Sequence, residues 1–162
     1  MDNVILISGP AGCGLSSAEF VFEELGYYVI KNAPASSVRP ICEELLQRGM
    51  NNIAFVSHAT GASQSLTNLR GMGSINFRYI VLNTAEEELL KRFYLTRHVH
   101  PRTVTENISP EEAIRKDIKD TLNVVNEANL YIDTTTLTVK QLRQRLYKFL
   151  EDVEENKMPS LN

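Results

Sequence analysis

The sequence predicts an α/β fold in which helices flank a mainly parallel, five-stranded sheet. Short apolar runs of strand length alternate along the chain with segments whose apolar residues have helical spacing. The run at 3–8, NVILIS, is nearly continuous in apolar side chains, as expected of a strand buried on both faces of a parallel sheet. Parallel strands joined through helices place those helices on the two faces of the sheet. We therefore expect three layers, in the order helix, sheet and helix.

The composition is that of one soluble domain. The chain has 162 residues, of which 43% are hydrophobic and 23% are charged, and this length suffices for a well-packed core. We place the domain at 1–150 and expect the charged and then polar segment 151–162 to fray. No apolar run approaches the roughly 18 residues of a membrane span, and the N-terminus lacks the features of a signal peptide.

The cysteines and the net charge indicate the cellular compartment of the protein and limit its binding partners. Cys13 and Cys42 lack ligand-type spacing, so the sequence indicates neither a disulfide framework nor a zinc site. We therefore expect a cytoplasmic protein that does not bind membranes. The net charge of −3 and the pI near 5.7 disfavour nucleic-acid binding, because such binding needs clustered Lys and Arg side chains against phosphate.

The other elements follow in chain order from local signals. Residues 16–25 have helical spacing of apolar side chains, and Gly26 then favours the end of that helix. We expect a helix at 39–48, which starts near Pro40, and one short helix at 63–70 within a segment rich in Gly, Ser, Thr and Asn. The remaining strands are expected at 27–31, 52–57, 78–83 and 130–133.

Three later helices carry capping-box patterns at their starts. In this pattern a Ser or Thr is followed three residues later by Glu or Gln, and the two side chains satisfy backbone N–H groups that the helix leaves unpaired. The pattern predicts helix starts at three pairs of residues, namely Thr84 with Glu87, Ser109 with Glu112, and Thr138 with Gln141.

A glycine-rich segment, GPAGCGLSS, joins the first strand to the first helix. It has the spacing of a phosphate-binding loop, G-x-x-x-x-G-K-[ST], except that Leu15 stands in the lysine position. Glycines allow close approach to a phosphate, and successive N–H groups at a helix N-terminus favour an anion. This context predicts a P-loop NTPase-like fold. The candidate phosphate-binding residues are Gly9, Pro10, Ala11, Gly12, Cys13, Gly14, Leu15, Ser16 and Ser17, with the Ser16 hydroxyl as a Mg²⁺ ligand if that ion binds.

The missing lysine affects chemistry more than binding. Phosphoryl transfer depends on charges that stabilise the transferring group, and loss of one preorganised donor costs on the order of 10²–10³ in rate. Leu15 cannot replace the lost hydrogen bonds. We therefore expect weakened binding of ATP, GTP or phosphate, with little or no hydrolysis. The alternative is that the segment is only a glycine-rich turn.

Candidate cations lie at two places beyond the loop. Lys31 ends the second strand at the same sheet edge as the loop, and it is either a substitute for the lost lysine or a solvated side chain. Arg92 and Arg97 fall near the end of a helix and would close over phosphates as a lid. Cations also suit a helix C-terminus through its dipole, which is the other explanation. We interpret the nearby His98 and His100 as surface histidines, since no third metal ligand is evident.

An NTPase also needs an acidic residue at the end of a neighbouring strand to organise Mg²⁺. The third strand ends at 57–60, SHAT, which contains no carboxylate. Asp133 ends the fifth strand, but the threonines that follow explain it equally well as a turn or cap. The sequence therefore leaves Mg²⁺ binding uncertain.

Three segments in order resemble the RNase adapter protein RapZ family, specifically its N-terminal P-loop domain. ISGPAGCGLSSAEFVFEELGYYVIKNAP resembles that family's loop, first helix and G-[FY]-Y-x-x-D-N-x-P segment. IVLNTAEEELLKRFYLTRHVHP is similar to its L-x-x-R-[FY]-x-x-T-R-x-x-H-P stretch. SPEEAIRKDIKDTLNVVNEANLYIDTTTLTVKQLRQRL resembles its closing helix, strand and helix. The resemblance runs from about Val4 to Leu146.

The resemblance implies a regulatory, nucleotide-binding module. Members of the family bind ATP and GTP, hydrolyse them slowly and act as adapters. In some bacteria they present small RNAs to an endoribonuclease and monitor an amino-sugar phosphate. The family's lid segment maps onto Arg92, Thr96, Arg97, His100 and Pro101. Its GTP-associated D-x-R-N motif maps onto a possible second nucleotide motif at Ser57, His58, Ala59 and Thr60.

The departures from the family concern phosphate and metal chemistry. Leu15 replaces the lysine, Lys31 replaces an aspartate, and His98 replaces one lid arginine. The Asp and Arg of D-x-R-N are absent. Family chains are nearly twice as long, with a C-terminal domain tied to RNA and sugar-phosphate recognition. The resemblance thus implies a degenerate domain with a nucleotide ligand and a protein partner, and no RNA partner without that second domain.

We therefore expect a RapZ-like regulatory or adapter domain that binds nucleotide weakly. Two other functions stay open. One is a P-loop small-molecule kinase, which would need a general base and a carboxylate for Mg²⁺. The other is a protein-interaction scaffold with an empty loop, for which the sequence leaves self-association open.

Overall fold

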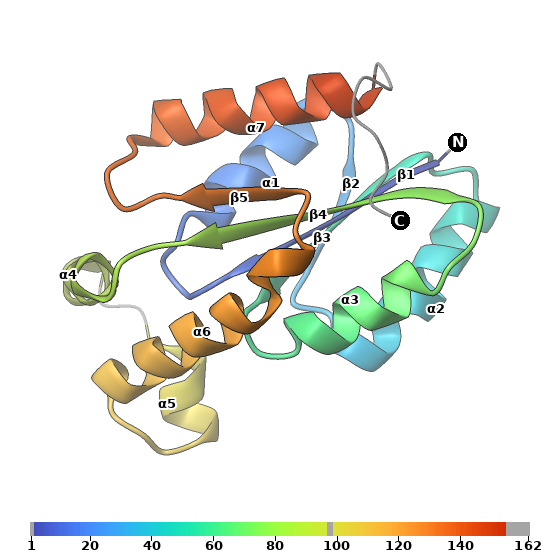
Figure 1. Cartoon of the computed structure of the whole chain (residues 1–162). Coiled ribbons are helices and arrows are strands. Elements are labelled where there is room, and N and C mark those ends of the chain that lie inside the picture. Colours follow the sequence, from blue (N-terminus) through green and yellow to red (C-terminus); the bar gives the residue numbers. More distant parts are fainter. Residues whose placement is uncertain (1, 97–98, 155–162) are drawn as a thin grey trace.

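A computed structural model describes residues 2–96 and 99–154 of the chain. The strands alternate with helices, as the sequence predicts (Figure 1). The elements are β1 (Asp2–Gly9), α1 (Leu15–Glu24), β2 (Tyr28–Lys31), α2 (Ala35–Gln47), β3 (Asn52–His58), α3 (Ala62–Arg70), β4 (Ile75–Asn83), α4 (Glu86–Thr96), α5 (Pro101–Thr105), α6 (Pro110–Val124), the 3₁₀ turn η1 (Val125–Glu127), β5 (Leu130–Asp133) and α7 (Val139–Glu154).

The sheet has five strands in the order β2-β3-β1-β4-β5, and every pairing is parallel. β1 lies at its centre, between β3 and β4. Because all strands run the same way, their carboxyl ends share one edge. In this register the last residue of β1, Gly9, is the partner of His58 at the end of β3. The predicted parallel α/β fold is confirmed.

The helices form a layer on each face of the sheet (Figure 1). Alternate residues of β1 point to opposite faces, so Ile5 and Ile7 pack into one core cluster and Val4 and Leu6 into the other. The first cluster includes buried side chains of α1 and α7, and the second includes those of α2 and α3. Helices α4 and α5 lie at the carboxyl edge of the sheet, where α6 contacts both of them.

Two elements, α2 and β4, begin three or more residues earlier than the sequence predicts. α2 starts at Ala35 and runs through Pro40, because a proline within a helix removes one hydrogen bond without necessarily ending it. β4 starts at Ile75, before the predicted 78, and includes Asn76, whose amide Nδ2 donates to Asn3 Oδ1 at 2.9 Å. These pairing partners lie far away in the sequence, so local residue types gave no sign of the longer strand.

Two of the three predicted caps are confirmed and one is wrong. The Ser109 hydroxyl accepts from Glu112 N–H at 3.2 Å, and Thr138 and Gln141 form the full reciprocal box. Thr84 does not cap α4, since its hydroxyl is buried and lies 2.7 Å from that of Thr134. Tertiary contact between two loops has replaced the local cap.

The structure adds α5, a short helix that the sequence analysis did not predict. It also extends α7 to Glu154, past the boundary that we placed at 150, and the rest of the predicted tail lies outside the described residues. Of the family-lid residues that the structure describes, Arg92 and Thr96 lie on α4, Pro101 begins α5 and His100 caps it.

Gly9 is required by close packing at the end of β1. A Cβ atom there would lie 2.5 Å from the Leu82 carbonyl oxygen and 2.6 Å from Cys13 Sγ. We predict that Gly9→Ala lowers the free energy of unfolding by about 2–3 kcal/mol, the range for overpacking a rigid site. Gly73→Ala is the matched control, because a Cβ there meets nothing within 4 Å. Urea unfolding of the two variants should show a large loss only for Gly9→Ala; equal stabilities would contradict the close packing.

Candidate functional site

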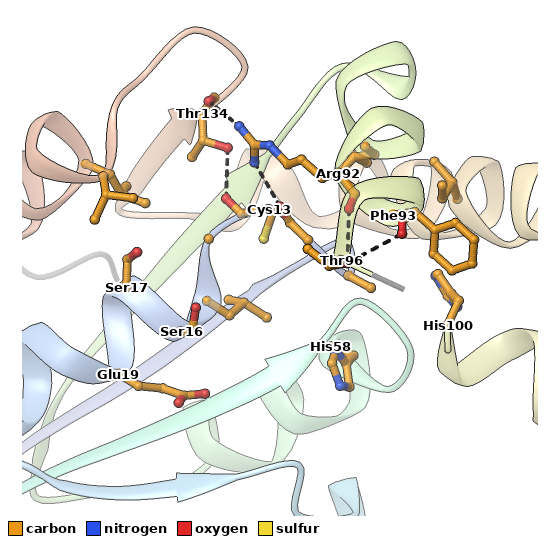
Figure 2. A pocket seen from close by; sticks show the side chains of 18 of the residues that line it. Cys13, Ser16, Ser17, Glu19, His58, Arg92, Phe93, Thr96, His100 and Thr134 are labelled. Carbon is orange, nitrogen blue, oxygen red and sulfur yellow. Dashed lines mark hydrogen bonds between the residues drawn. The ribbon is translucent and has the colours of Figure 1, made fainter. Parts of the chain in front are cut away.

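The carboxyl edge of the sheet holds a cavity of about 760 Å³ (Figure 2). The loop after β1 and the first turn of α1 form one wall. α4, α5 and α6 contribute a second, and the β5–α7 connection with the start of α7 contributes a third. This is the edge at which α/β proteins bind ligands, and the cavity is of ordinary size for a small-molecule site.

The glycines of the loop adopt backbone conformations that other residues rarely adopt. Gly12 has a φ of 89°, and Gly14, which caps α1, has a φ of 114°. A Cβ on Gly14 would lie 2.7 Å from Leu142 Cδ2, so the loop also fits closely against α7. Conformation therefore requires glycine at both positions, and space also requires it at Gly14.

Among the residues that the structure describes, several N–H groups of this loop have no hydrogen-bond partner. Ala11 N–H donates to Asp117 Oδ2 at 3.0 Å, and the N–H groups of Cys13 and Ser17 donate to loop carbonyls. Across the described part of the chain, the backbone N–H groups of Gly12, Gly14, Leu15 and Ser16 have no partner. All four residues line the cavity at the N-terminus of α1. Such unpaired donors form a cradle for an anion.

Arg92 braces the loop from its carbonyl side. One guanidinium nitrogen donates to the Gly12 carbonyl at 2.8 Å and another to the Thr134 carbonyl at 3.1 Å (Figure 2). Thr134 in turn donates its hydroxyl to the Cys13 carbonyl at 2.8 Å. These bonds engage the Gly12 and Cys13 carbonyl groups of a loop whose residues line the cavity. Arg92 therefore adds a positive charge beside the cradle while its hydrogen bonds hold the loop.

The other predicted cations do not share the position of Arg92 beside the loop. Lys31 does not line the cavity, and its Nζ lies 3.6 Å from Glu19 Oε2 with its side chain 56% exposed. Glu19 does line the cavity, so Lys31 neutralises an acidic wall residue instead of facing a phosphate directly. Arg97 and His98 lie outside the described residues.

The remaining predicted loop and strand-end residues are mostly enclosed. Gly9 and Pro10 are buried. Burial also raises the pKa of the Cys13 thiol to about 12, so this cysteine stays protonated at neutral pH. In the predicted second motif, His58 lines the cavity. Ser57 and Ala59 are buried, and Thr60 is exposed away from the cavity lining.

The structure also reveals a buried polar network that the sequence analysis missed. His100, which we interpreted as a surface histidine, is only 4% exposed, so that interpretation is wrong. Its Nε2 lies 2.7 Å from Asp117 Oδ2, and its Nδ1 accepts from Arg102 N–H at 3.0 Å. Since Nδ1 is an acceptor, we assign the ring proton to Nε2, which donates to the carboxylate.

Asp117 joins three elements at one buried carboxylate. Besides Ala11 and His100, it accepts from Arg102 Nε at 2.7 Å. Burial raises the pKa of Asp117, but hydrogen bonds from His100, Ala11 N–H and Arg102 outweigh it, so the pKa lies below its usual value. Asp117 shares a buried face of α6 with Ala113, Ile114 and Thr121. That helical spacing was the available sign that this charge is not solvent-facing.

The donor set for a metal is small. Among the described residues no three His, Cys, Asp or Glu side chains gather to hold a metal ion. At the cradle, Ser16, Ser17 and Glu19 offer side-chain oxygen atoms, and the Glu19 carboxylate lies near Lys31. Mg²⁺ is commonly held by one or two carboxylates together with ligand phosphates and waters. These residues therefore fit Mg²⁺ only as an ion carried chiefly by a phosphorylated ligand.

A parallel sheet whose central strand runs into a glycine loop at a helix N-terminus, with the spacing of GPAGCGLSS, places the chain among the P-loop α/β proteins. The family model for the RapZ-like N-terminal domain matches residues 2–154 of the sequence. The chain therefore belongs to that family. No helix within the described residues is long and apolar enough to cross a membrane.

Curated relatives carry the description nucleotide-binding protein. One from Hahella chejuensis is 32% identical over 152 residues, which cover 88% of this chain and 53% of the relative. Another, from Thiobacillus denitrificans, is 36% identical over 146 residues, which cover 86% of this chain and 51% of the relative. The chain thus spans about half the length of the curated relatives it matches.

Solved structures share the fold at low identity. Shikimate kinase from Acinetobacter baumannii, in complex with shikimate, aligns with a TM-score of 0.63 and 20% identity over 98% of this chain and 96% of the kinase. The Bacillus subtilis protein YorR, in complex with phosphorylated GDP, aligns with a TM-score of 0.62 and 15% identity over 94% of this chain and 98% of that protein. These similarities support the P-loop fold.

The buried carboxylate yields a pH-dependent prediction. We expect Asp117→Asn to lower the free energy of unfolding by about 3 kcal/mol at pH 7, because it breaks a buried ion pair. The folded-state pKa of Asp117 lies below the ordinary 3.8, so its stabilisation is present above that value and is lost as the pH falls through the folded-state pKa. The difference in the free energy of unfolding between the wild type and Asp117→Asn should therefore become smaller below about pH 4.

Asp120→Asn is the matched control for this measurement. Asp120 also bonds Arg102, but its side chain is 41% exposed and does not contact the loop. Urea unfolding from pH 3 to pH 7 should show a loss below about 1 kcal/mol for this variant. Equal losses for the two variants would argue against a special role of the buried carboxylate.

Proposed function

We propose that this chain binds a nucleotide, ATP or GTP, through its phosphates at the loop between β1 and α1. The observation that carries the proposal is the set of N–H groups on Gly12, Gly14, Leu15 and Ser16, which line the cavity and have no partner within the described part of the chain. The α1 N-terminus adds roughly half an elementary positive charge, and Arg92 lies against the same loop. The curated relatives' description as nucleotide-binding proteins agrees with this proposal.

We propose further that the domain acts as a regulatory or adapter module with little or no hydrolysis. Leu15 is partly buried and packs against a core cluster, so it contributes no charge to a transferring phosphoryl group. Arg92 uses its guanidinium to hold carbonyl groups of the loop and of Thr134. Without a free lysine, the site supports binding better than turnover. A bound nucleotide would then signal occupancy to a protein partner.

Thermal unfolding with ligand tests the binding. Millimolar ATP or GTP, with and without Mg²⁺, should raise the Tm of the wild type by several degrees if the concentration reaches about 100 times Kd, which corresponds to roughly 2.7 kcal/mol. Gly12→Ala should abolish or strongly reduce this shift, since it distorts the cradle.

Gly49→Ala is the matched control for that variant. Gly49 has a φ of 86°, close to the 89° of Gly12, but it lies far along the chain at the end of α2. Both variants should lose about 1–2 kcal/mol through backbone strain, while only Gly12→Ala should lose the ligand response. A wild type that shows no shift would leave the loop as a structural relic and favour a scaffold with an empty loop.

Hydrolysis is a separate prediction. We expect less than one turnover per minute of ATP or GTP, because the charge that stabilises the transferring group is missing. Release of phosphate from γ-labelled nucleotide would measure this. Several turnovers per minute that disappear in Gly14→Ala would show that the site is an NTPase after all. Transfer of phosphate to small metabolites, which this assay can include, would indicate the kinase alternative.

A further inference from the structure

The helix layer formed by α1 and α7 carries charges of opposite sign on its two helices. These helices pack side by side on one face of the sheet, and both begin at its carboxyl edge (Figure 1). The charged side chains of α1 are all acidic, namely Glu19, Glu23 and Glu24. Those of α7 between residues 139 and 148 are all basic, namely Lys140, Arg143, Arg145 and Lys148. The layer therefore presents an acidic helix beside a basic one.

Most of these charges are not used inside the chain. The exposed members that point outward from the layer are Glu23, Glu24, Lys140 and Lys148. Within residues 2–96 and 99–154, none of them forms an ion pair or a side-chain hydrogen bond. Glu19, in contrast, lies near Lys31 of β2. An acidic row on α1 and a basic row on α7 are therefore available to a partner.

An arginine and two aromatic side chains lie between the two rows. The Arg143 guanidinium carbon stands 4.0 Å from the centroid of the Phe20 ring, which is 41% exposed. Tyr147, one helical turn further along α7, is partly buried against the core cluster below. Arginine and aromatic residues are enriched at the centres of protein–protein interfaces, whereas Lys and Glu are more frequent on the rest of the surface. The face thus has the composition of an interface core with charged rows on either side.

A two-fold axis makes this face complementary to itself. An axis that lies in the contact plane, along the two helices, places α1 of one copy over α7 of the other and preserves the height of each residue along the helices. Phe20 and Arg143 mark one common height. Glu23 lies three residues further along α1 and Lys148 five residues further along α7, so their heights differ by only about 3 Å. The acidic row of each copy therefore faces the basic row of the other.

We propose that the α1–α7 face is the interface of a homodimer in which these rows pair between copies. Charge complementarity favours a second copy over a partner of one charge sign, because a purely acidic or purely basic surface would match one helix and repel the other. Both helices begin at the carboxyl edge, so the two cavities lie at the same end of the dimer. The dimer forms without nucleotide and is independent of the function proposed above.

Charge reversal tests the interface in solution. Sedimentation equilibrium of the full chain at low ionic strength, without nucleotide, should show a wild-type dimer. Glu23→Lys and Lys148→Glu each place like charges opposite one another, so we expect each to raise the dimer Kd by about ten-fold or more. Combining the two exchanges the charges and restores pairing of opposite signs. The Kd of the combined variant should therefore return to within about three-fold of the wild-type value.

Arg145→Glu is the matched control. Arg145 is also exposed on α7, but it lies about 200° around the helix from Arg143, on the flank that faces away from α1. The same change of charge there should alter the dimer Kd by less than about three-fold. Circular dichroism would confirm that each variant is folded.

The outcomes are distinct from those for nucleotide binding. A wild type that stays monomeric at millimolar concentration would overturn the homodimer. Equal responses of the Kd to Lys148→Glu and Arg145→Glu would overturn this interface, and so would a combined variant that does not regain the dimer. The thermal shift with ATP or GTP reports on the proposed function separately, whether the protein is a monomer or a dimer.

Discussion

The structure depends on the hydrogen bonds that hold the loop between β1 and α1 in place. Its carbonyl groups are bonded to Arg92 and Thr134, and its Ala11 N–H is bonded to Asp117, so the orientation of the loop does not depend on a ligand. The partners come from α4, from the β5–α7 connection and from α6. The parallel sheet brings these distant segments to one edge. An arrangement of preorganised N–H groups therefore follows from the topology together with a few long-range hydrogen bonds.

The same bonds connect the loop with the elements that cover it. Asp117 accepts from Ala11 of the loop and also from His100 and Arg102 at the start of α5. A movement of α5 away from α6 would break bonds to the carboxylate that also holds the loop. Since a buried carboxylate without partners is strongly disfavoured, these elements are expected to keep their relative positions or to move together.

The sequence predicted the fold well because its signals are local and repeated. Apolar runs, helical spacing and the caps at Ser109 and Thr138 each depend on residues near one another in the chain. It failed where distant residues decide the outcome, as at Thr84, whose hydroxyl meets that of Thr134, and at Asn76, which extends β4 through Asn3. The loop at Gly9–Ser17 was found from its spacing. The burial of His100 and Asp117 was not, because charged and polar side chains normally indicate a solvent-exposed face.

In the function that we propose, Leu15 stands where the phosphate-loop pattern has lysine and contributes packing in place of charge. A lysine at this position would have to remain solvated or paired with phosphate, whereas Leu15 is partly buried against the cluster between α1 and α7. Burial of apolar surface contributes roughly 25 cal/mol per Å², and it does so whether or not a ligand is present. Arg92, whose hydrogen bonds go to backbone carbonyls, stabilises the loop in the same ligand-independent manner. A loop built in this way is already ordered before binding, so a ligand would meet a formed cradle and lose little free energy in ordering it. That property agrees with the regulatory role that we propose, in which the domain responds to the presence of a nucleotide and does not transfer its phosphate.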